Sequence, residues 1–423
     1  MEKVYIVTLK NRDDLEDFYA EMSSKGFKLH MKRKISRNTN YYMTQEQADE
    51  LKKDSRVLDV ELADNIIVKP TAIYNNTTYN RNGFFWKTGS FPIPTDFQWG
   101  SIHAGSASQI GKGTFGKVAS GGTTQRKNEN VTTFNNGKHV DVVIVDDPMA
   151  YDSEEWYSPS TNTSRFVQYQ WFNELNSIVT SIDDDGFTPP TGNVTYHQNS
   201  ALDKSHGQHV GGTVAGQYYG WANEANIYCL TKLGSFHSGQ TISGYLIYDY
   251  LRAFHLHKAV NPVTGRRNPT ITNHSYGGIF YFNPEQEVLS FSKLSSVFYR
   301  GTQYNSGNPG PSGWTQAGVV EDAKDAVEDG VIFIGSAGND NLLIAEPSSD
   351  STADWQNTIT WEYASGDIRT RHYNRGAWPT SPDSGAIIVG ALENLHFFPR
   401  ASFSMFGPGV DIFAPGRNII SCY

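Results

Sequence analysis

The stretch between Ser205 and Gly216 places the tightest constraint on the fold of this chain. It reads Ser-His-Gly-Gln-His-Val-Gly-Gly-Thr-Val-Ala-Gly, which predicts a helix with His206 in its first turn. Glycine inside a helix costs about 1 kcal/mol relative to alanine. The glycines at 211, 212 and 216 therefore indicate that a sheet or another helix packs very close. We expect His206 at the exposed end of the helix, where a base can be held in place and still reach a substrate.

The run from Val140 to Asp147 predicts a buried strand that ends in carboxylates, because it reads Val-Asp-Val-Val-Ile-Val-Asp-Asp. Uninterrupted valine and isoleucine are typical of parallel sheets covered on both faces. Sites in such sheets lie at the carboxyl ends of strands, so the acids that end this run are candidate site residues. Without other motifs, a strand capped by solvated acids would be the better interpretation.

A second predicted strand has a helix before it and a polar turn after it. The helix ends at Gly330, and its apolar residues recur at helical spacing. These residues are Val320, Ala323, Ala326 and Val327. The strand covers 331–334 and leads into Gly-Ser-Ala-Gly-Asn, which ends at Asn339. Alone, Gly-Asn would be interpreted as a turn. Behind a helix and a buried strand, it is a candidate for function.

Taken in order, these motifs resemble those of the subtilisin-like serine proteases (subtilases). The histidine motif at 206–210, the aspartate run, Ala-Gly-Asn at 337–339 and the segment 401–416 each have a counterpart in that family. The resemblance implies an α/β fold with a doubly wound, mostly parallel sheet. It also implies a serine endopeptidase that acts on polypeptide substrates and requires no cofactor.

The resemblance assigns a role to each site residue. Asp146 is the acid that orients the base, His206 is the base, and Asn339 supplies an amide to the oxyanion hole. The substrate-binding residues that it implies are Ser275, Tyr276, Gly277 and Gly338. Two departures stand out: Gln208 replaces the usual threonine, and Asp147-Pro148 replace the usual small residue and glycine. Asp147 is therefore the second choice for the acid.

The family nucleophile is a serine in Gly-Thr-Ser-x-Ala, and this motif does not occur in the 423 residues. Ser421 lacks the flanking residues. We expect a zymogen-like chain that ends before the nucleophile motif, as a fragment or as one part of an interrupted gene, and that is inactive alone. The alternative is a non-catalytic binding or structural protein on the same scaffold. A metal-dependent hydrolase built on His206 and His209 is a third interpretation, although the glutamate of His-Glu-x-x-His is absent.

Residues 1–68 predict a small α+β module of order βαββαβ, as in ferredoxin-like folds. Three of its four strands can be placed, at 4–7, 27–35 and 57–62, together with helices at 15–22 and 44–51 and a turn at 38–40. Its place ahead of the histidine motif resembles that of the subtilase propeptide, which serves as an intramolecular chaperone and inhibitor. The alternative is an accessory domain.

The rest of the chain divides into two parts. Residues 69–137 predict a linker and the irregular start of the catalytic domain, with a maturation cut between Lys69 and Trp99. Within it, 111–118 matches a kinase glycine-rich loop, but the other kinase motifs are missing. Residues 138–423 predict the catalytic domain, C-terminally incomplete, with an insertion of loops at 279–315.

Composition narrows the choice of partners. A net charge of −9 argues against a nucleic-acid surface, which would need clustered Lys and Arg. The sequence has no apolar run of membrane-spanning length and no secretion signal, and it does not predict a compartment. The acidic run 181–186 lacks the alternating EF-hand pattern and favours a solvated turn. Structural calcium remains possible on the resemblance alone, and the sequence offers no ligand set for it.

Overall fold

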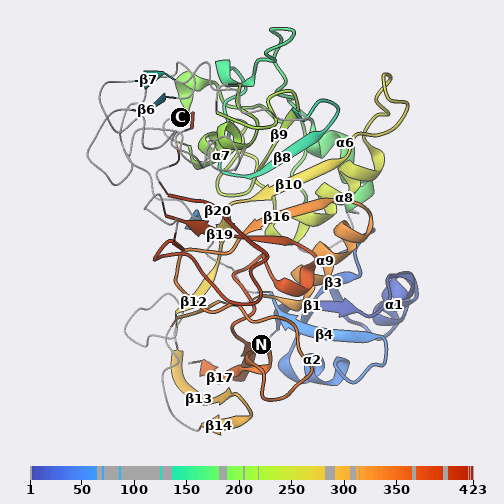
Figure 1. The fold of residues 1–423 in the computed structure, drawn as a ribbon. Coiled ribbons are helices and arrows are strands. Elements are labelled where there is room, and N and C mark those ends of the chain that lie inside the picture. Colours follow the sequence, from blue (N-terminus) through green and yellow to red (C-terminus); the bar gives the residue numbers. More distant parts are fainter. Residues whose placement is uncertain are drawn as a thin grey trace.

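The N-terminal module is an antiparallel sheet in the order β2-β3-β1-β4 with two helices (Figure 1). The elements are β1 (Lys3–Leu9), α1 (Leu15–Ser24), β2 (Lys28–Met31), β3 (Asn38–Met43), α2 (Gln45–Leu51) and β4 (Val57–Leu62). A capping box between Thr44 and Gln47 opens α2. The module has a hydrophobic core of its own. The order of these elements along the chain is βαββαβ.

The predicted turn at 38–40 is wrong, because these residues begin β3 and pair with β1. Their side chains are polar but buried. Asn38 explains this, because its Nδ2 donates to Gly318 O at 2.7 Å and to an Asp322 carboxylate oxygen at 2.9 Å. Polar residues that read as a solvated turn thus face another unit of the protein.

The structure, a computed structural model, describes residues 2–63, 69–70, 85–86, 124–125, 136–180, 188–202, 205–217, 219–281, 291–304, 311–313, 315–363, 368–393, 399–417, 419 and 421–422. The kinase-like loop at 111–118, the acidic run at 181–186 and most of the predicted linker lie outside these residues. Across the described ranges, no helix has both the length and the apolar character needed to cross a bilayer.

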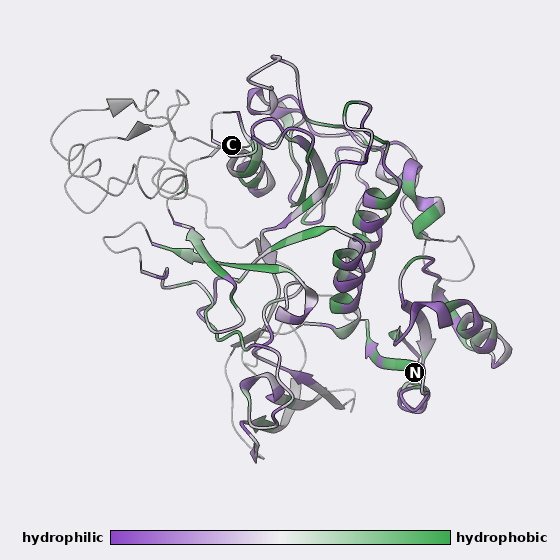
Figure 2. Cartoon of the chain, turned by 45° about the vertical axis from the view of Figure 1, so that its right-hand side comes forward, coloured by the Kyte–Doolittle hydropathy of each residue, from purple (hydrophilic) through white to green (hydrophobic). Residues whose placement is uncertain are grey.

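The larger unit is built on a six-stranded sheet in the order β20-β19-β16-β10-β8-β9, and every neighbouring pair is parallel. Its strands are β8 (Asp141–Asp146), β9 (Asn226–Thr231), β10 (Thr270–His274), β16 (Ile332–Ser336), β19 (Ile387–Leu392) and β20 (Ile412–Pro415). All six residues of β8 are buried, and the strands of this sheet are largely hydrophobic in Figure 2. The predicted α/β fold with a mostly parallel sheet is confirmed.

The strand order reverses beside β8. The chain places β9 on one side of β8 and then crosses to the other side to form β10. Connections from the carboxyl ends of β8 and β10 therefore diverge. Open α/β sheets bind ligands in the crevice at such a switch point, so this edge of the sheet is where a site is expected.

In the part of the chain that the structure describes, four α-helices pack around the sheet, namely α6 (Trp171–Val179), α7 (His206–Ala215), α8 (Ile247–His257) and α9 (Ala317–Glu328). The α7 helix contacts β8, and α8 contacts both α6 and α9. The α9 helix packs against β16 of the large sheet and also against β1 and β4 of the N-terminal module. It therefore joins the two units.

The module docks on α8 and α9 through a buried arginine. Arg33 is 1% exposed. Its Nε lies 2.8 Å from Asp249 Oδ2 on α8, and its Nη2 lies 2.7 Å from Asp322 Oδ2 on α9. A buried guanidinium with carboxylates on two helices fixes the position of the module, because each charge depends on the others for the solvation that it has lost.

A buried carboxylate holds the amino end of α9. Glu61 on β4 accepts the backbone N–H of Gly318 at 3.2 Å and a hydrogen bond from Arg371 Nη1 at 2.5 Å. A carboxylate is stabilising at this end of a helix, where N–H groups lack intrahelical partners. The module thereby contacts the central domain and a further sheet at one residue.

That further sheet has the order β14-β13-β17-β18. Its strands are β13 (Phe291–Tyr299), β14 (Thr302–Tyr304), β17 (Thr358–Tyr363) and β18 (Ile368–His372), and β12 (Ile279–Tyr281) pairs with β15 (Pro311–Gly313) nearby in sequence. The prediction of loops at 279–315 is therefore wrong. The main partner of β13 is β17. Because β17 comes much later in the chain, no local sequence pattern predicts this pairing. A separate short pair joins β6 (Phe85–Trp86) to β7 (Thr124–Gln125).

Candidate active site

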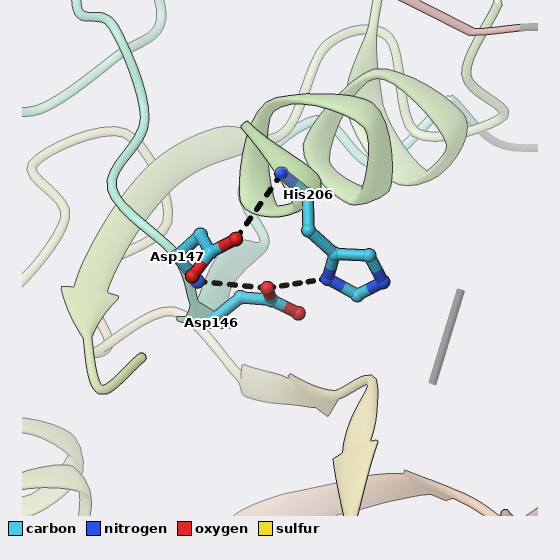
Figure 3. Close-up of side chains that lie close together, drawn as sticks. All are labelled: Asp146, Asp147 and His206. Atoms are coloured by element: carbon cyan, nitrogen blue, oxygen red, sulfur yellow. Dashed lines mark hydrogen bonds and ion pairs between the residues drawn. The ribbon is translucent and has the colours of Figure 1, made fainter. Parts of the chain in front are cut away.

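Asp146 and His206 come from separate elements and are in direct contact (Figure 3). Asp146 is the last residue of β8, and His206 is the first residue of α7. The distance between Asp146 Oδ1 and His206 Nδ1 is 2.5 Å. His206 is only 1% exposed, so the expectation of an exposed helix end is wrong. The contact commits Nδ1 to the acid and leaves Nε2 as the ring nitrogen that can serve a substrate-side group.

The residues around this pair fix where α7 begins. The Ser205 hydroxyl accepts the N–H of Gln208 at 3.3 Å, as an N-cap, and donates to the carbonyl of Pro148. Asp147 Oδ2 accepts the backbone N–H of His206 at 3.3 Å. Asp147, the second choice for the acid, therefore contacts the helix backbone and Asp146 the ring. A Cβ at Gly207 would collide with the carbonyl oxygen of Asp147, so the close approach of strand and helix requires glycine there.

The other glycines of α7 admit side chains from loops. A Cβ at Gly211 would collide with Met149, and one at Gly212 with Cys422 and Ser421. The close packing that the sequence indicates is present, and its partners are loop side chains together with side chains of the short helix Glu154–Trp156, which face Gly211 and Gly216. Met149 follows β8, and 421–422 follow β20, so segments beyond the carboxyl ends of strands fill this space.

Burial dominates the electrostatics of the pair. It raises the pKa of Asp146 well above its usual value, and the N–H of Asp147, 2.7 Å from Oδ1, opposes this while the Asp147 charge reinforces it. Burial, together with His209, lowers the pKa of His206 to about 4. At 2.5 Å the two groups titrate as one unit. The imidazole is therefore held neutral near pH 7, which is the state a general base needs.

His274 is the most deeply buried imidazole near the sheet edge. It ends β10, its Nδ1 lies 3.0 Å from Tyr276 Oη, and its Nε2 lies 3.1 Å from Thr272 Oγ1. Its ring stacks on Tyr248 with an interplanar angle of 15°. The structure thus makes it a packed histidine that supports the next strand, and burial lowers its pKa to about 3.

This histidine should make the fold sensitive to acid. Its pKa falls from an unfolded value of about 6.5 to about 3 in the folded state, so between these values the unfolded chain binds a proton that the folded chain does not. Stability should decline as pH falls below about 6.5, with His274 contributing up to about 1.4 kcal/mol per pH unit. Urea unfolding at pH 7, 6 and 5 measures this slope. The His274→Gln variant should show a shallower slope, and an unchanged slope would contradict the assignment.

The segment after His274 already pairs with another piece of the chain. Strand β11 (Tyr276–Gly277) is antiparallel to β5 (Lys69–Pro70), with Gly277 opposite Lys69 and Tyr276 opposite Pro70. Ser275, just before β11, donates from Oγ to Asn273 Oδ1 at 2.8 Å. Three of the predicted substrate-binding residues, 275–277, therefore lie on or directly before a strand whose edge pairs with β5.

Asn339 and Gly338 follow β16 on the same edge of the sheet. Gly338 has φ of 108°, and a Cβ there would lie 2.9 Å from Met405 Cε. Its carbonyl accepts the N–H of Met405 at 3.0 Å, so the turn into Asn339 is set by a glycine-only conformation. Because β8, β10 and β16 are consecutive in the sheet, Asp146, Ser275 and Asn339 follow the same ends of three neighbouring strands.

One group in the described part of the chain has the residue types of a metal site, namely Asp146, Asp147 and His206, whose ligand atoms lie within 4.8 Å of one another. Two ligands of a tetrahedral zinc would be about 3.4 Å apart for bonds of about 2.1 Å. Asp146 Oδ1 and His206 Nδ1 are 2.5 Å apart, which fits a hydrogen bond. His209 contacts the carbonyl of Ile419 through Nε2 at 3.1 Å. The geometry therefore does not favour a metal held by His206 and His209.

Comparison with known families shows to which protein family this chain belongs. The sequence pattern of the subtilase family matches residues 69–423. The chain belongs to the subtilase family. The acid, base and amide that the motifs indicated lie within the matched region.

Curated relatives of this subtilase are distant. "Subtilisin-like protease 5" from Trichophyton tonsurans is 26% identical over 216 residues, which are 51% of this chain and 36% of that protein. "Alkaline protease 1" from Emericella nidulans is 25% identical over 220 residues, 52% of this chain and 36% of that protein. The matched region thus spans only 36% of the length of these relatives.

Solved structures similar to this subtilase include two bacterial enzymes. The epidermin leader peptide processing serine protease (EpiP) from Staphylococcus aureus has a TM-score of 0.47 and 13% identity, with 98% of this chain and 75% of that chain covered. Fervidolysin from Fervidobacterium pennivorans has a TM-score of 0.45 and 18% identity, with 98% of this chain and 47% of that chain covered.

Two features of the site were not predicted from the sequence. Gln208, a departure from the family motif, accepts the backbone N–H of Ala150 with its side-chain oxygen at 3.0 Å, so in this subtilase its amide ties α7 to the loop after β8. The pairing of β5 with β11 has no signature in the two residues of β5. Only their place, directly after the N-terminal module, could have suggested it.

Proposed function

We propose that this chain supplies the acid, the base and the oxyanion amide of a serine endopeptidase that cleaves polypeptides. The observation that carries the proposal is the 2.5 Å contact between Asp146 and His206. It lies at the carboxyl edge of a parallel sheet, beside a strand that accepts an extended segment. Acyl transfer requires a buried acid, a buried imidazole and a strand that binds the peptide. A protein that only binds a partner does not require the acid and the imidazole.

In the proposed reaction Asp146 keeps the proton of His206 on Nδ1, so that Nε2 takes the serine proton as the hydroxyl attacks the peptide carbonyl. The same nitrogen then returns the proton to the leaving amine. The side-chain amide of Asn339 donates to the oxygen on which negative charge develops, and one such donor is typically worth 10²–10³ in kcat. The proposal assigns the serine to a segment outside these 423 residues, because no Gly-Thr-Ser-x-Ala occurs among them.

The second part of the proposal concerns domain roles. Residues 1–68 act as an inhibitory and chaperoning module, 69–137 as a connection and the start of the catalytic domain, and 138–423 as the catalytic domain. Two observations support this: β5 follows the module and lies on β11, and buried ionic contacts from Arg33 and Glu61 join the module to the domain.

The test uses the protein expressed from its complete gene and treated with a fluorophosphonate probe for activated serines. We expect labelling of one serine and hydrolysis of denatured protein, both lost in the His206→Ala variant. The matched control is His257→Ala, because His257 is exposed at the end of α8, and it should retain both. A folded protein that shows neither labelling nor hydrolysis would favour the non-catalytic scaffold.

A further inference from the structure

Lys232 places a positive charge beside the proposed peptide-binding strand. It directly follows β9, and its backbone N–H donates to the carbonyl of Asp146 at 2.8 Å. It therefore lies at the carboxyl edge of the sheet, next to the residue that orients the base. Its Nζ lies 3.2 Å from where a Cβ on Gly244 would be and 5.8 Å from the ring centroid of Trp378.

Trp378 connects this lysine to the strand. Its carbonyl accepts the N–H of Gly278 at 2.8 Å, and Gly278 is the residue directly after β11. The Trp378 ring also lies 6.2 Å from the ring of Tyr276, measured between centroids. Through Trp378 the ammonium group lies near the end of β11, and the proposed function takes β11 as the strand that pairs with the peptide upstream of its scissile bond.

The charge has no counter-ion among the residues that the structure describes. Within the described ranges, no carboxylate lies within ion-pair distance of Lys232 Nζ, and burial lowers the pKa of the amine. Among the same residues, the indole Nε1–H of Trp378, which is 2% exposed, has no acceptor. The Lys232 ammonium group is half-buried, the Trp378 N–H is buried, and neither has an acceptor in the part of the chain described. A carboxylate on a ligand could accept hydrogen bonds from these groups and neutralise the positive charge.

We propose that Lys232 is a specificity-determining residue that selects polypeptides carrying an acidic side chain upstream of the scissile bond. The inference rests on the proposed function, because it takes β11 as the strand that binds substrate. Lys232 does not act on the reacting atoms. It fills, with its ammonium group, the space that Gly244 leaves open beside Trp378.

The test measures binding of labelled hexapeptides to the full chain by fluorescence anisotropy. Each peptide is polyalanine with one glutamate at one position upstream of the scissile bond, and the set covers every such position. Two further sets carry leucine or lysine in place of glutamate. We expect one position at which glutamate binds about tenfold more tightly than leucine, as for a hydrogen bond to a charged group. Because β5 occupies β11, every apparent affinity is lowered by the same factor, and the ratios are unaffected.

Variants separate the possible outcomes. Lys232→Met should abolish the glutamate preference, and Lys232→Glu should replace it with a preference for lysine. Lys138→Met removes the same charge from an exposed residue at the amino-terminal end of β8 and should leave the ratios unchanged. Peptides that bind without preferring glutamate, or that keep the preference in Lys232→Met, would overturn the role of Lys232. If no peptide of any charge binds, the failure lies with the peptide-binding strand of the proposed function.

Discussion

Asp146→Asn is expected to lower kcat by about 10⁴-fold in the protein expressed from its complete gene, with little change in KM. Asparagine preserves the shape of the side chain but no longer holds the proton of His206 on Nδ1, and a base in the wrong tautomer cannot accept the serine proton. Stability should stay the same or rise, because burial already disfavours the charged carboxylate. Initial rates on a peptide substrate and urea unfolding of the same preparations test both statements.

Asp147→Asn is the matched control for this prediction. Asp147 is adjacent in sequence and similar in chemistry, but its carboxylate accepts the backbone N–H of His206, whereas the carboxylate of Asp146 hydrogen-bonds to the ring. An asparagine oxygen can accept that hydrogen bond, so kcat should fall less than tenfold. A larger loss in Asp147→Asn than in Asp146→Asn would reverse the assignment of the acid.

Arg33→Met is expected to destabilise the chain by about 3–5 kcal/mol, because removing one partner of a buried ionic contact leaves the others uncompensated. Asp249 and Asp322 are both buried and would lose the cation between them. Burial already raises the pKa of Asp249 to about 7, despite Arg33, and should raise it further in the variant. Urea unfolding of wild type and variant measures the difference.

The pH dependence of this loss gives a second check. A carboxyl whose pKa is higher in the folded than in the unfolded state favours folding at low pH, and that contribution is lost as pH rises through the folded pKa. The destabilisation by Arg33→Met should therefore be smaller at pH 5 than at pH 8. Lys32→Met is the control, since Lys32 pairs with Glu16 at 3.3 Å on the surface and should cost less than about 1 kcal/mol. Equal losses in the two variants would contradict a buried role for Arg33.

The sequence predicted the parts of the fold whose signals are local. The valine-rich run ending at Asp146 could be recognised as a buried strand, and Ser205 with the following glycines as the start of a close-packed helix. Both elements lie where those patterns require, and they bring Asp146 and His206 together. Each pattern depends on how often apolar residues recur along a short stretch of the chain, and a few neighbouring residues determine this spacing.

The errors came from contacts between distant segments. The polar run from Asn38 to Asn40 read as a turn, because nothing near it in sequence shows that the amide of Asn38 hydrogen-bonds to α9. Strand β13 read as loop because its partner β17 comes later in the chain. The exposure of His206 was misjudged for the same reason, since the segments that cover a helix end are not next to it in sequence.

The position of β5 on β11 has a quantitative consequence. A blocking strand that is covalently joined to its own cleft is present at an effective concentration fixed by the length of its tether, so dilution cannot release it. A free peptide must exceed that local concentration to bind. Under the proposed function, the block of β11 by β5 should therefore be independent of protein concentration, and it should become concentration-dependent only after the connection between the module and β11 is cut.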